Sequence, residues 1–192
     1  MSAAFNTPQT PSAIYRRVLG DVWSQLPEPV RLAHSVGRTL HGRFRISHGT
    51  RWLAGRLARW SGLPDASEDA KTELRITDEG GRERWERHFE DVAFTTEQWV
   101  SANRHLIERF NGWELEFALH AEGSALVYVQ RRARLRLGRL RIRVPLLVAP
   151  RVRAKETGIG ATRVRVEVNV SLPLIGLLIA YDGHLEVAVQ TP

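Results

Sequence analysis

Few residues of this chain have the type and spacing that chemistry needs. The 192 residues include no cysteine, which excludes thiolate nucleophiles, iron–sulfur clusters and cysteine-based zinc sites. The stretch 158–160 lacks the third glycine of a dinucleotide-binding loop, and no G-x-S-x-G nucleophile motif occurs. His34, His41 and His48 are seven residues apart, but glycines between them rule out one continuous helix. We therefore expect no metal, no cofactor and no catalytic residue, and an enzyme ranks third among the functions considered.

Aromatic and polar side chains in the second half suggest a pocket. Trp113, Phe117 and Tyr128 recur at strand spacing, which suits either a hydrophobic core or the wall of a small-molecule site. Tyr181, Asp182 and His184 follow an apolar stretch and suit either a hairpin turn or the polar mouth of that site. The candidate ligand-binding residues are Trp113, Phe117, Tyr128, Tyr181 and His184.

The most unusual feature of the sequence is a series of alternating arginines, called here the arginine ladder. Arg132, Arg134 and Arg136 have the same parity as Leu126 and Tyr128. An unbroken strand would therefore carry the arginines along the aromatic face. Either a bulge near residue 131 flips the register, or the arginines line the polar end of a cavity.

A turn at Gly138-Arg139 would place arginines opposite one another on two strands. Like charges facing each other across a ladder cost up to about 1 kcal/mol per pair unless acids or an anion lie between them. The predicted pairs are Arg136 with Arg141 and Arg134 with Arg143, and the candidate anion-binding or partner-binding residues are Arg132, Arg134, Arg136, Arg141 and Arg143.

The charge is divided between two segments. The formal net charge is +7, and residues 131–165 hold eleven Arg and one Lys against the single acid Glu156. Residues 66–122 hold fourteen acids against seven bases. The arginines can pair with these acids inside the fold, bind an anionic lipid surface or an acidic protein partner, or bind nucleic acid. We disfavour nucleic acid because no recognition helix or RNP-like aromatic pair is present.

The elements that must position these residues are helices first and strands afterwards. Ser12 is the expected N-cap of a helix whose apolar stripe extends to Leu26, and a second short helix should carry Pro29 and end near Gly37. A strand around 40–46 follows, and Thr50 can cap a further short helix that ends at Gly62-Leu63-Pro64.

From Lys71 onward the hydrophobic period changes to two, as in an antiparallel meander. The Asn111-Gly112 pair predicts a type I′ hairpin in which Phe110 faces Trp113, Leu106 faces Phe117 and Arg109 faces Glu114. Strands are expected after Pro150 and around Val164 to Val170, and a final turn at Asp182-Gly183. The sequence therefore predicts an α+β fold, with N-terminal helices packed on a large, curved, mainly antiparallel sheet or open barrel.

The ends of the chain and its apolar runs predict location and domain organisation. Residues 1–11 lack the basic and apolar regions of a secretory signal and are expected to be a flexible lead-in, followed by one globular domain over 12–192. The longest apolar run, 172–181, contains Pro173 and Gly176 and is shorter than the ~20 residues of a membrane-spanning helix. We expect no transmembrane segment and a cytoplasmic protein.

Four segments carry a resemblance to a known family. They are SAIYRRVLGDVWSQLP (12–27), RWLAGRLARWSGLP (51–64), RFNGWELEFAL (109–119) and SLPLIGLLIAYDGHL (171–185). With these the chain resembles the bacterial domain-of-unknown-function family 4166, although residues 131–144 contain more arginine than is typical of it. The resemblance implies no activity. It implies an association with an oxidoreductase-like partner, because the domain also occurs fused behind a saccharopine-dehydrogenase-like domain.

These observations favour a non-catalytic or accessory module that binds a small apolar or amphipathic molecule in the concavity of the sheet, with arginines at the rim of the concavity for an anionic group of the ligand. The alternative is an interaction domain that binds an acidic protein, an anionic lipid surface or nucleic acid through the arginine-rich strand face.

Overall fold

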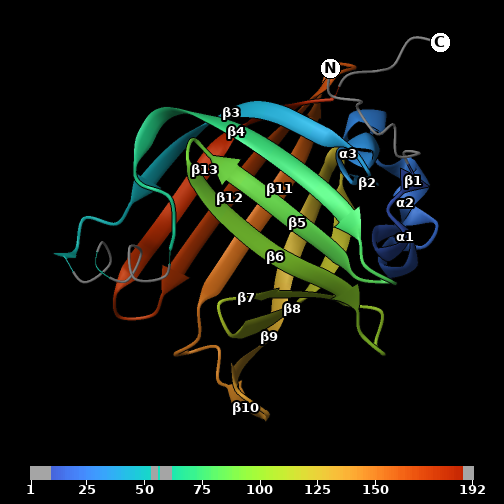
Figure 1. The fold of residues 1–192 in the computed structure, drawn as a ribbon. Helices are drawn as coiled ribbons and strands as arrows, with labels where there is room; N and C mark the ends of the chain where they lie inside the picture. The colour runs from blue at the N-terminus through green and yellow to red at the C-terminus, as the bar shows by residue number, and fades with distance from the viewer. Residues whose placement is uncertain (1–9, 53–55, 57–61, 188–192) are drawn as a thin grey trace, which may run out of the picture.

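Ten antiparallel strands form a closed barrel in the computed structural model, which describes residues 10–52, 56 and 62–187 (Figure 1). Most barrel strands pair with the strands before and after them in the sequence. The exceptions are that β9 pairs with β11 as well as with β8, and that the last strand, β13, pairs with the first, β3. The barrel strands are β3 (Thr39–His48), β4 (Ser67–Asp78), β5 (Glu83–Phe89), β6 (Val92–Val100), β7 (Leu106–Phe110), β8 (Trp113–Glu122), β9 (Ala125–Leu137), β11 (Arg151–Ile159), β12 (Arg163–Leu172) and β13 (Gly176–Glu186). The predicted helices and curved antiparallel sheet are present, and the chain is mainly β. The predicted curved sheet or open barrel is a closed barrel, because β8 at one edge of the sheet pairs with β9.

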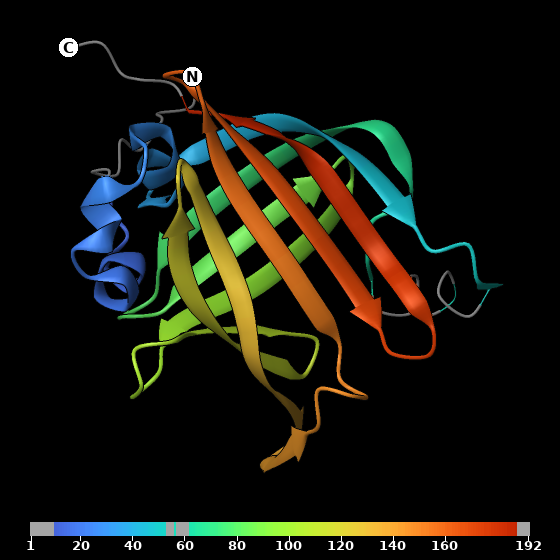
Figure 2. The same ribbon diagram turned by 180° about the vertical axis from the view of Figure 1, so that it is seen from behind.

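Three short helices cover one end of the barrel (Figure 2). They are α1 (Ala13–Leu19), α2 (Val22–Gln25) and α3 (Glu28–Ala33). Ser12 caps α1 as predicted, with its hydroxyl oxygen accepting from the backbone N–H of Tyr15 at 3.2 Å. The single predicted helix is in fact two, because Gly20 ends α1 in a left-handed conformation with φ 59°.

The remaining N-terminal predictions concern residues at the edge of the described chain. Most of the predicted lead-in falls outside the described residues, and its last two, Thr10–Pro11, form β1, which pairs with β2 (Ser35–Val36). Most of the helix predicted after Thr50 also lies outside the described residues. Within the described part of the chain, no helix is long and apolar enough to cross a membrane.

The predicted hairpin at Asn111-Gly112 is confirmed. Phe110 pairs with Trp113, Leu106 with Phe117, and Arg109 with Glu114. Asn111 and Gly112 have φ values of 44° and 81°, the left-handed values that a type I′ turn requires.

A bulge at Arg131 resolves the parity of the arginine ladder. Phe117 pairs with Gln130 and Glu116 pairs with Arg132, so that residue 131 has no partner on β8. Tyr128 therefore faces the barrel interior, whereas Arg132 and the alternate arginines after it face outward. Of the two predicted alternatives, the bulge is the one that the structure contains.

The predicted turn at Asp182-Gly183 is wrong. β13 continues through both residues, and the turn lies earlier, between β12 and β13, where Leu174 and Gly176 have φ values of 71° and 92°. Gly183 is required because β3 passes very close to β13. A Cβ there would overlap the carbonyl oxygen of Arg43 and would lie 2.7 Å from the Cα of Phe44.

Candidate ligand-binding site

The barrel encloses a cavity of about 600 Å³. Side chains from all ten barrel strands line it, and Tyr15 of α1 and Ala33 of α3 close it at the helix end. Leu63, Asn111 and Leu172, which line it too, belong to the end opposite α1, α2 and α3. The volume falls within the roughly 300–1,000 Å³ of small-molecule sites. The cavity thus extends along the barrel from the helix end to the opposite end.

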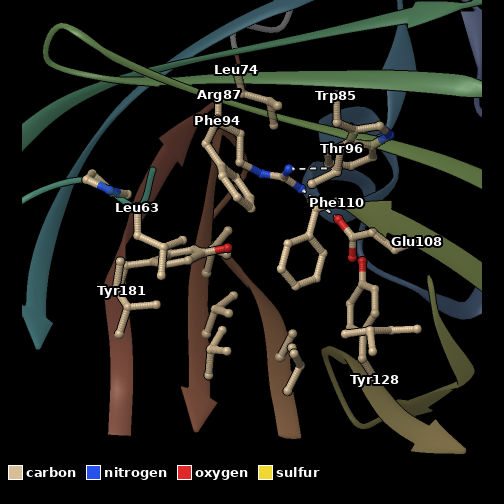
Figure 3. Close-up of a pocket in the computed structure, with 18 of the residues that line it drawn as sticks. Leu63, Leu74, Trp85, Arg87, Phe94, Thr96, Glu108, Phe110, Tyr128 and Tyr181 are labelled. Carbon is tan, nitrogen blue, oxygen red and sulfur yellow. Dashed lines mark hydrogen bonds and ion pairs between the residues drawn. The ribbon is translucent and has the colours of Figure 1, made fainter. Parts of the chain in front are cut away.

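Arg87 places a positive charge inside this mostly apolar space (Figure 3). It lies on β5 between two inward-facing aromatic residues, Trp85 and Phe89, so the pleat directs it inward. Its Nη1 donates to the Oγ1 of Thr96 at 3.0 Å. Its Nη2 lies 3.7 Å from the Oε1 of Glu108, a loose ion pair. The guanidinium carbon is 5.1 Å from the centre of the Trp85 ring.

Arg87 keeps N–H donors that can bind a ligand in the cavity. An arginine has five N–H donors, and Arg87 makes one hydrogen bond within the described residues. The Arg87 and Glu108 side chains are 15% and 18% exposed. Burial opposes the charge on Arg87, but interactions with Tyr181 and Glu108 outweigh it, so that the pKa of Arg87 lies above its ordinary value. Burial raises the pKa of Tyr181 to about 12. The site therefore presents a permanent cation and a neutral phenol to a ligand.

A polar network forms the floor of the cavity beneath the helices. The hydroxyl of Tyr15 donates to the Oε1 of Gln98 at 2.9 Å and lies 3.1 Å from the hydroxyl of Tyr128. Tyr128 donates to the Oε1 of Glu156 at 2.8 Å. The Nε2 of His34 lies 2.6 Å from the Oε2 of Glu156. His34 is buried against the Tyr15 ring, with ring centres 3.9 Å apart. The network links α1 and the C-cap residue of α3 to β6, β9 and β11.

The network holds a buried carboxylate. Burial tends to raise the pKa of Glu156, but His34 and Tyr128 stabilise the charged form more strongly and lower it overall. Burial, together with the charge of Glu156, raises the pKa of Tyr15 and Tyr128 well above the ordinary value. Both phenols therefore stay neutral and keep the protons that they donate to Gln98 and to Glu156.

Glu156→Gln is expected to lower the free energy of unfolding by about 2 kcal/mol at pH 7, because charge-assisted hydrogen bonds are lost. A depressed carboxylate pKa contributes stability above the unfolded-state value, near 4.5, and this contribution is lost as the pH falls through the folded-state value. The difference between wild type and variant should therefore narrow as urea unfolding is repeated from pH 7 downwards. Glu167→Gln, on the neighbouring strand, is the control and should change stability by less than about 1 kcal/mol. A pH-independent difference would contradict this assignment.

The predicted aromatic residues and the predicted histidine lie on different faces. Trp113, Phe117, Tyr128 and Tyr181 all line the cavity. His184 lies outside the lining, because it alternates with the inward-facing Leu185 on β13 and pairs with Arg165 and Arg43 of the neighbouring strands.

The five predicted arginines lie outside the cavity lining. Arg132 and Arg134 lie 3.8 and 3.4 Å from the Oε2 of Glu116, and Arg141 lies 3.7 Å from the Oε1 of Glu114. Arg136 donates to the carbonyl oxygen of Gly138 at 3.1 Å. Arg143 pairs with Arg134 and Arg136 with Arg141, the predicted register. Both glutamates belong to the acidic segment 66–122, so pairing within the fold neutralises part of this face.

Sequence reasoning missed the central cation. Arg87 and Glu108 each occupy an inward position on an amphipathic strand, between Trp85 and Phe89 and between Leu106 and Phe110 respectively. A charged residue in an otherwise apolar inward row was the available signal. Tyr15 and Glu156 carried no comparable signal, because their hydrogen-bonding partners in the network are 28 to 122 residues away in the sequence. The described residues contain no cluster of three His, Cys, Asp or Glu that could hold a metal ion.

Comparisons with known proteins place the chain in a family. No curated protein matches it, and nothing found supports an oxidoreductase-like partner. Among solved structures, it is similar to a secretary abundant heat soluble protein from Ramazzottius varieornatus, at 11% identity and a TM-score of 0.40, over 78% of this chain and 93% of that one. A family model matches residues 26–185, from the end of α2 into the last barrel strand. The chain belongs to the family described as Domain of unknown function (DUF4166).

Proposed function

We propose that this protein binds a small amphipathic molecule inside the barrel, as a non-catalytic binding or carrier module. The apolar body of the ligand fills the cavity, and an acidic group of the ligand contacts Arg87. The observation that carries the proposal is the inward-facing guanidinium of Arg87, held by a single described hydrogen bond and one loose ion pair in a cavity of about 600 Å³. A cytoplasmic location stays a prediction.

The chemistry of the cavity selects the ligand class. Aromatic and aliphatic side chains form most of the wall, and burying a chain of about ten methylenes contributes roughly 8 kcal/mol, before the cost of lost motional freedom. A carboxylate can accept two hydrogen bonds from a guanidinium in fork geometry. A medium-chain or long-chain carboxylic acid therefore satisfies both parts of the site.

Titration with three probes of equal chain length tests the proposal: dodecanoic acid, dodecanol and dodecylamine. We expect the acid to bind with a dissociation constant of about 1 μM, the alcohol more weakly and the amine weakest. Trp85 and Trp113 line the cavity, so intrinsic fluorescence reports occupancy. Binding of none of the three, or preference for the amine, would contradict the proposal.

A pair of neighbouring substitutions on β11 provides a matched control. Ala154 lines the cavity, whereas Lys155 is exposed on the opposite face of the strand. Ala154→Trp should abolish binding of all three probes by filling the cavity, and Lys155→Trp should leave it unchanged. Equal effects of the two substitutions would place the probes outside the barrel.

A further inference from the structure

A basic and apolar hairpin projects beyond the end of the barrel opposite the helices (Figures 1 and 2). β10 (Leu140–Val144) pairs only with the end of β9. Leu137, Leu140 and Ile142 are 57%, 60% and 40% exposed, and the following segment exposes Leu147 at 74% and Val148 at 58%. Large apolar side chains exposed together in this way indicate a contact surface.

The hairpin has two chemically different faces. Leu137 pairs with Leu140, and Ala133 pairs with Val144 on the same face. Because Ala133 is buried in the barrel core, this apolar face continues the barrel's inner surface past its rim. The pairs Arg136 with Arg141 and Arg134 with Arg143 form the other face. The apolar side of the hairpin therefore continues the inner face of β9 and the arginine side continues its outer face.

The charge of this region is of one sign. Residues 131–155 hold ten bases and no acid. Glu114 and Glu116 pair with three of the arginines, whereas Arg139 and Arg143 are exposed and have no carboxylate partner within the described residues. Basic side chains without a carboxylate partner, beside exposed leucines, complement a surface that has an outer anionic layer over an apolar layer.

Two further apolar side chains lie at the same end of the barrel. The alternating strand directions place the loop after β3 and the turn between β12 and β13 at the end opposite the helices. These connections expose Trp52 at 70% and Leu174 at 89%. They are adjacent, because Nη1 of Arg51 donates to the carbonyl oxygen of Leu174 at 2.5 Å. Tryptophan favours the boundary between lipid and water.

We propose that the end of the barrel opposite the helices docks on an anionic phospholipid surface. Leu140 and Leu147 enter the interfacial layer, and Arg139 and Arg143 contact lipid phosphates. A second copy of the chain fits the same edge less well, because pairing two β10 strands would bring Arg141 and Arg143 of both copies together. The inference rests on the proposed function for its purpose: docking of this end, where Leu63 and Leu172 line the cavity, would let an amphipathic ligand pass between the bilayer and the cavity.

Vesicle flotation tests the docking. Wild type should bind vesicles of phosphatidylcholine with phosphatidylglycerol, bind pure phosphatidylcholine at least tenfold more weakly, and lose binding as salt is raised. Leu140→Ser with Leu147→Ser, and separately Arg139→Ser with Arg143→Ser, should each reduce partitioning about tenfold or more. The matched control is Ile159→Ser with Arg163→Ser, an exposed apolar and basic pair at the helix end, and it should bind as wild type does.

Three results would overturn the docking proposal. The first is absence of wild-type binding to anionic vesicles, and the second is an equal loss in the Ile159→Ser, Arg163→Ser control. The third is a dimer that Leu140→Ser dissociates, without vesicle binding, which would make a second copy the occupant. Ala154→Trp separates this inference from the proposed function: docking predicts vesicle binding equal to wild type, and its loss would mean that vesicles are bound only through the cavity.

Discussion

Arg87→Met should lower the affinity for dodecanoic acid about a hundredfold and leave the affinity for dodecanol nearly unchanged. A hydrogen bond to a charged group contributes about 1.5–3 kcal/mol, and about 3 kcal/mol corresponds to roughly a hundredfold change in the dissociation constant. In the wild type, the Nη2 of Arg87 lies 3.7 Å from the Oε1 of Glu108. Without Arg87, the Glu108 carboxylate loses this partner and repels a bound acid. Methionine is apolar and similar in length to the aliphatic stem of arginine, so the volume of the cavity changes little.

Glu108→Gln should change the affinity for dodecanoic acid in the opposite direction. Glu108 competes with an acidic ligand for the Arg87 guanidinium, so neutralising it should raise the affinity for dodecanoic acid several-fold. The double variant Arg87→Met with Glu108→Gln should bind acid and alcohol with similar affinity. Isothermal titration calorimetry with both probes measures these differences. If Arg87→Met weakened both probes equally, Arg87 would support the wall of the cavity and would not recognise the acidic group.

Gly183→Ala should destabilise the protein by about 3 kcal/mol or more. Overpacking costs typically about 1–3 kcal/mol, and more where the obstacle is backbone that cannot move aside. The added methyl group would meet the carbonyl oxygen of Arg43 and, at 2.7 Å, the Cα of Phe44. β13 and β3 are the last and first strands of the barrel, so the substitution would open the pairing that closes it. Urea unfolding followed by circular dichroism measures the loss.

Gly160→Ala is the control for Gly183→Ala. Gly160 has a φ of 61° and nothing within 4 Å of the added Cβ, so the backbone strain alone should cost about 1–2 kcal/mol. The barrel should remain closed, and probe binding should be retained. A Gly183→Ala protein as stable as the Gly160→Ala protein would show that β3 and β13 can separate without harm.

Short sequence patterns predicted two of the hairpins correctly. Asn111-Gly112 selects one turn type, and the turn then determines which residues face each other across β7 and β8. The arginine pairs across β9 and β10 followed in the same way from the turn at Gly138. Asp182-Gly183 has a similar turn signature but lies within a strand, because a neighbouring backbone and not a turn requires that glycine. A sequence alone does not distinguish these two uses of glycine.

The strand period, the hairpins, the N-terminal helices and the charge of residues 131–155 all follow from residues close together in the chain. Closure of the barrel depends on strands β3 and β13, more than a hundred residues apart, and on the single extra residue at Arg131 that turns the arginines outward. The cavity exists only after closure. Its floor joins Tyr15, Tyr128 and Glu156, and Arg87 meets Glu108 across β6. Long-range pairing creates these contacts, and the local propensities that shape each strand carry no information about them.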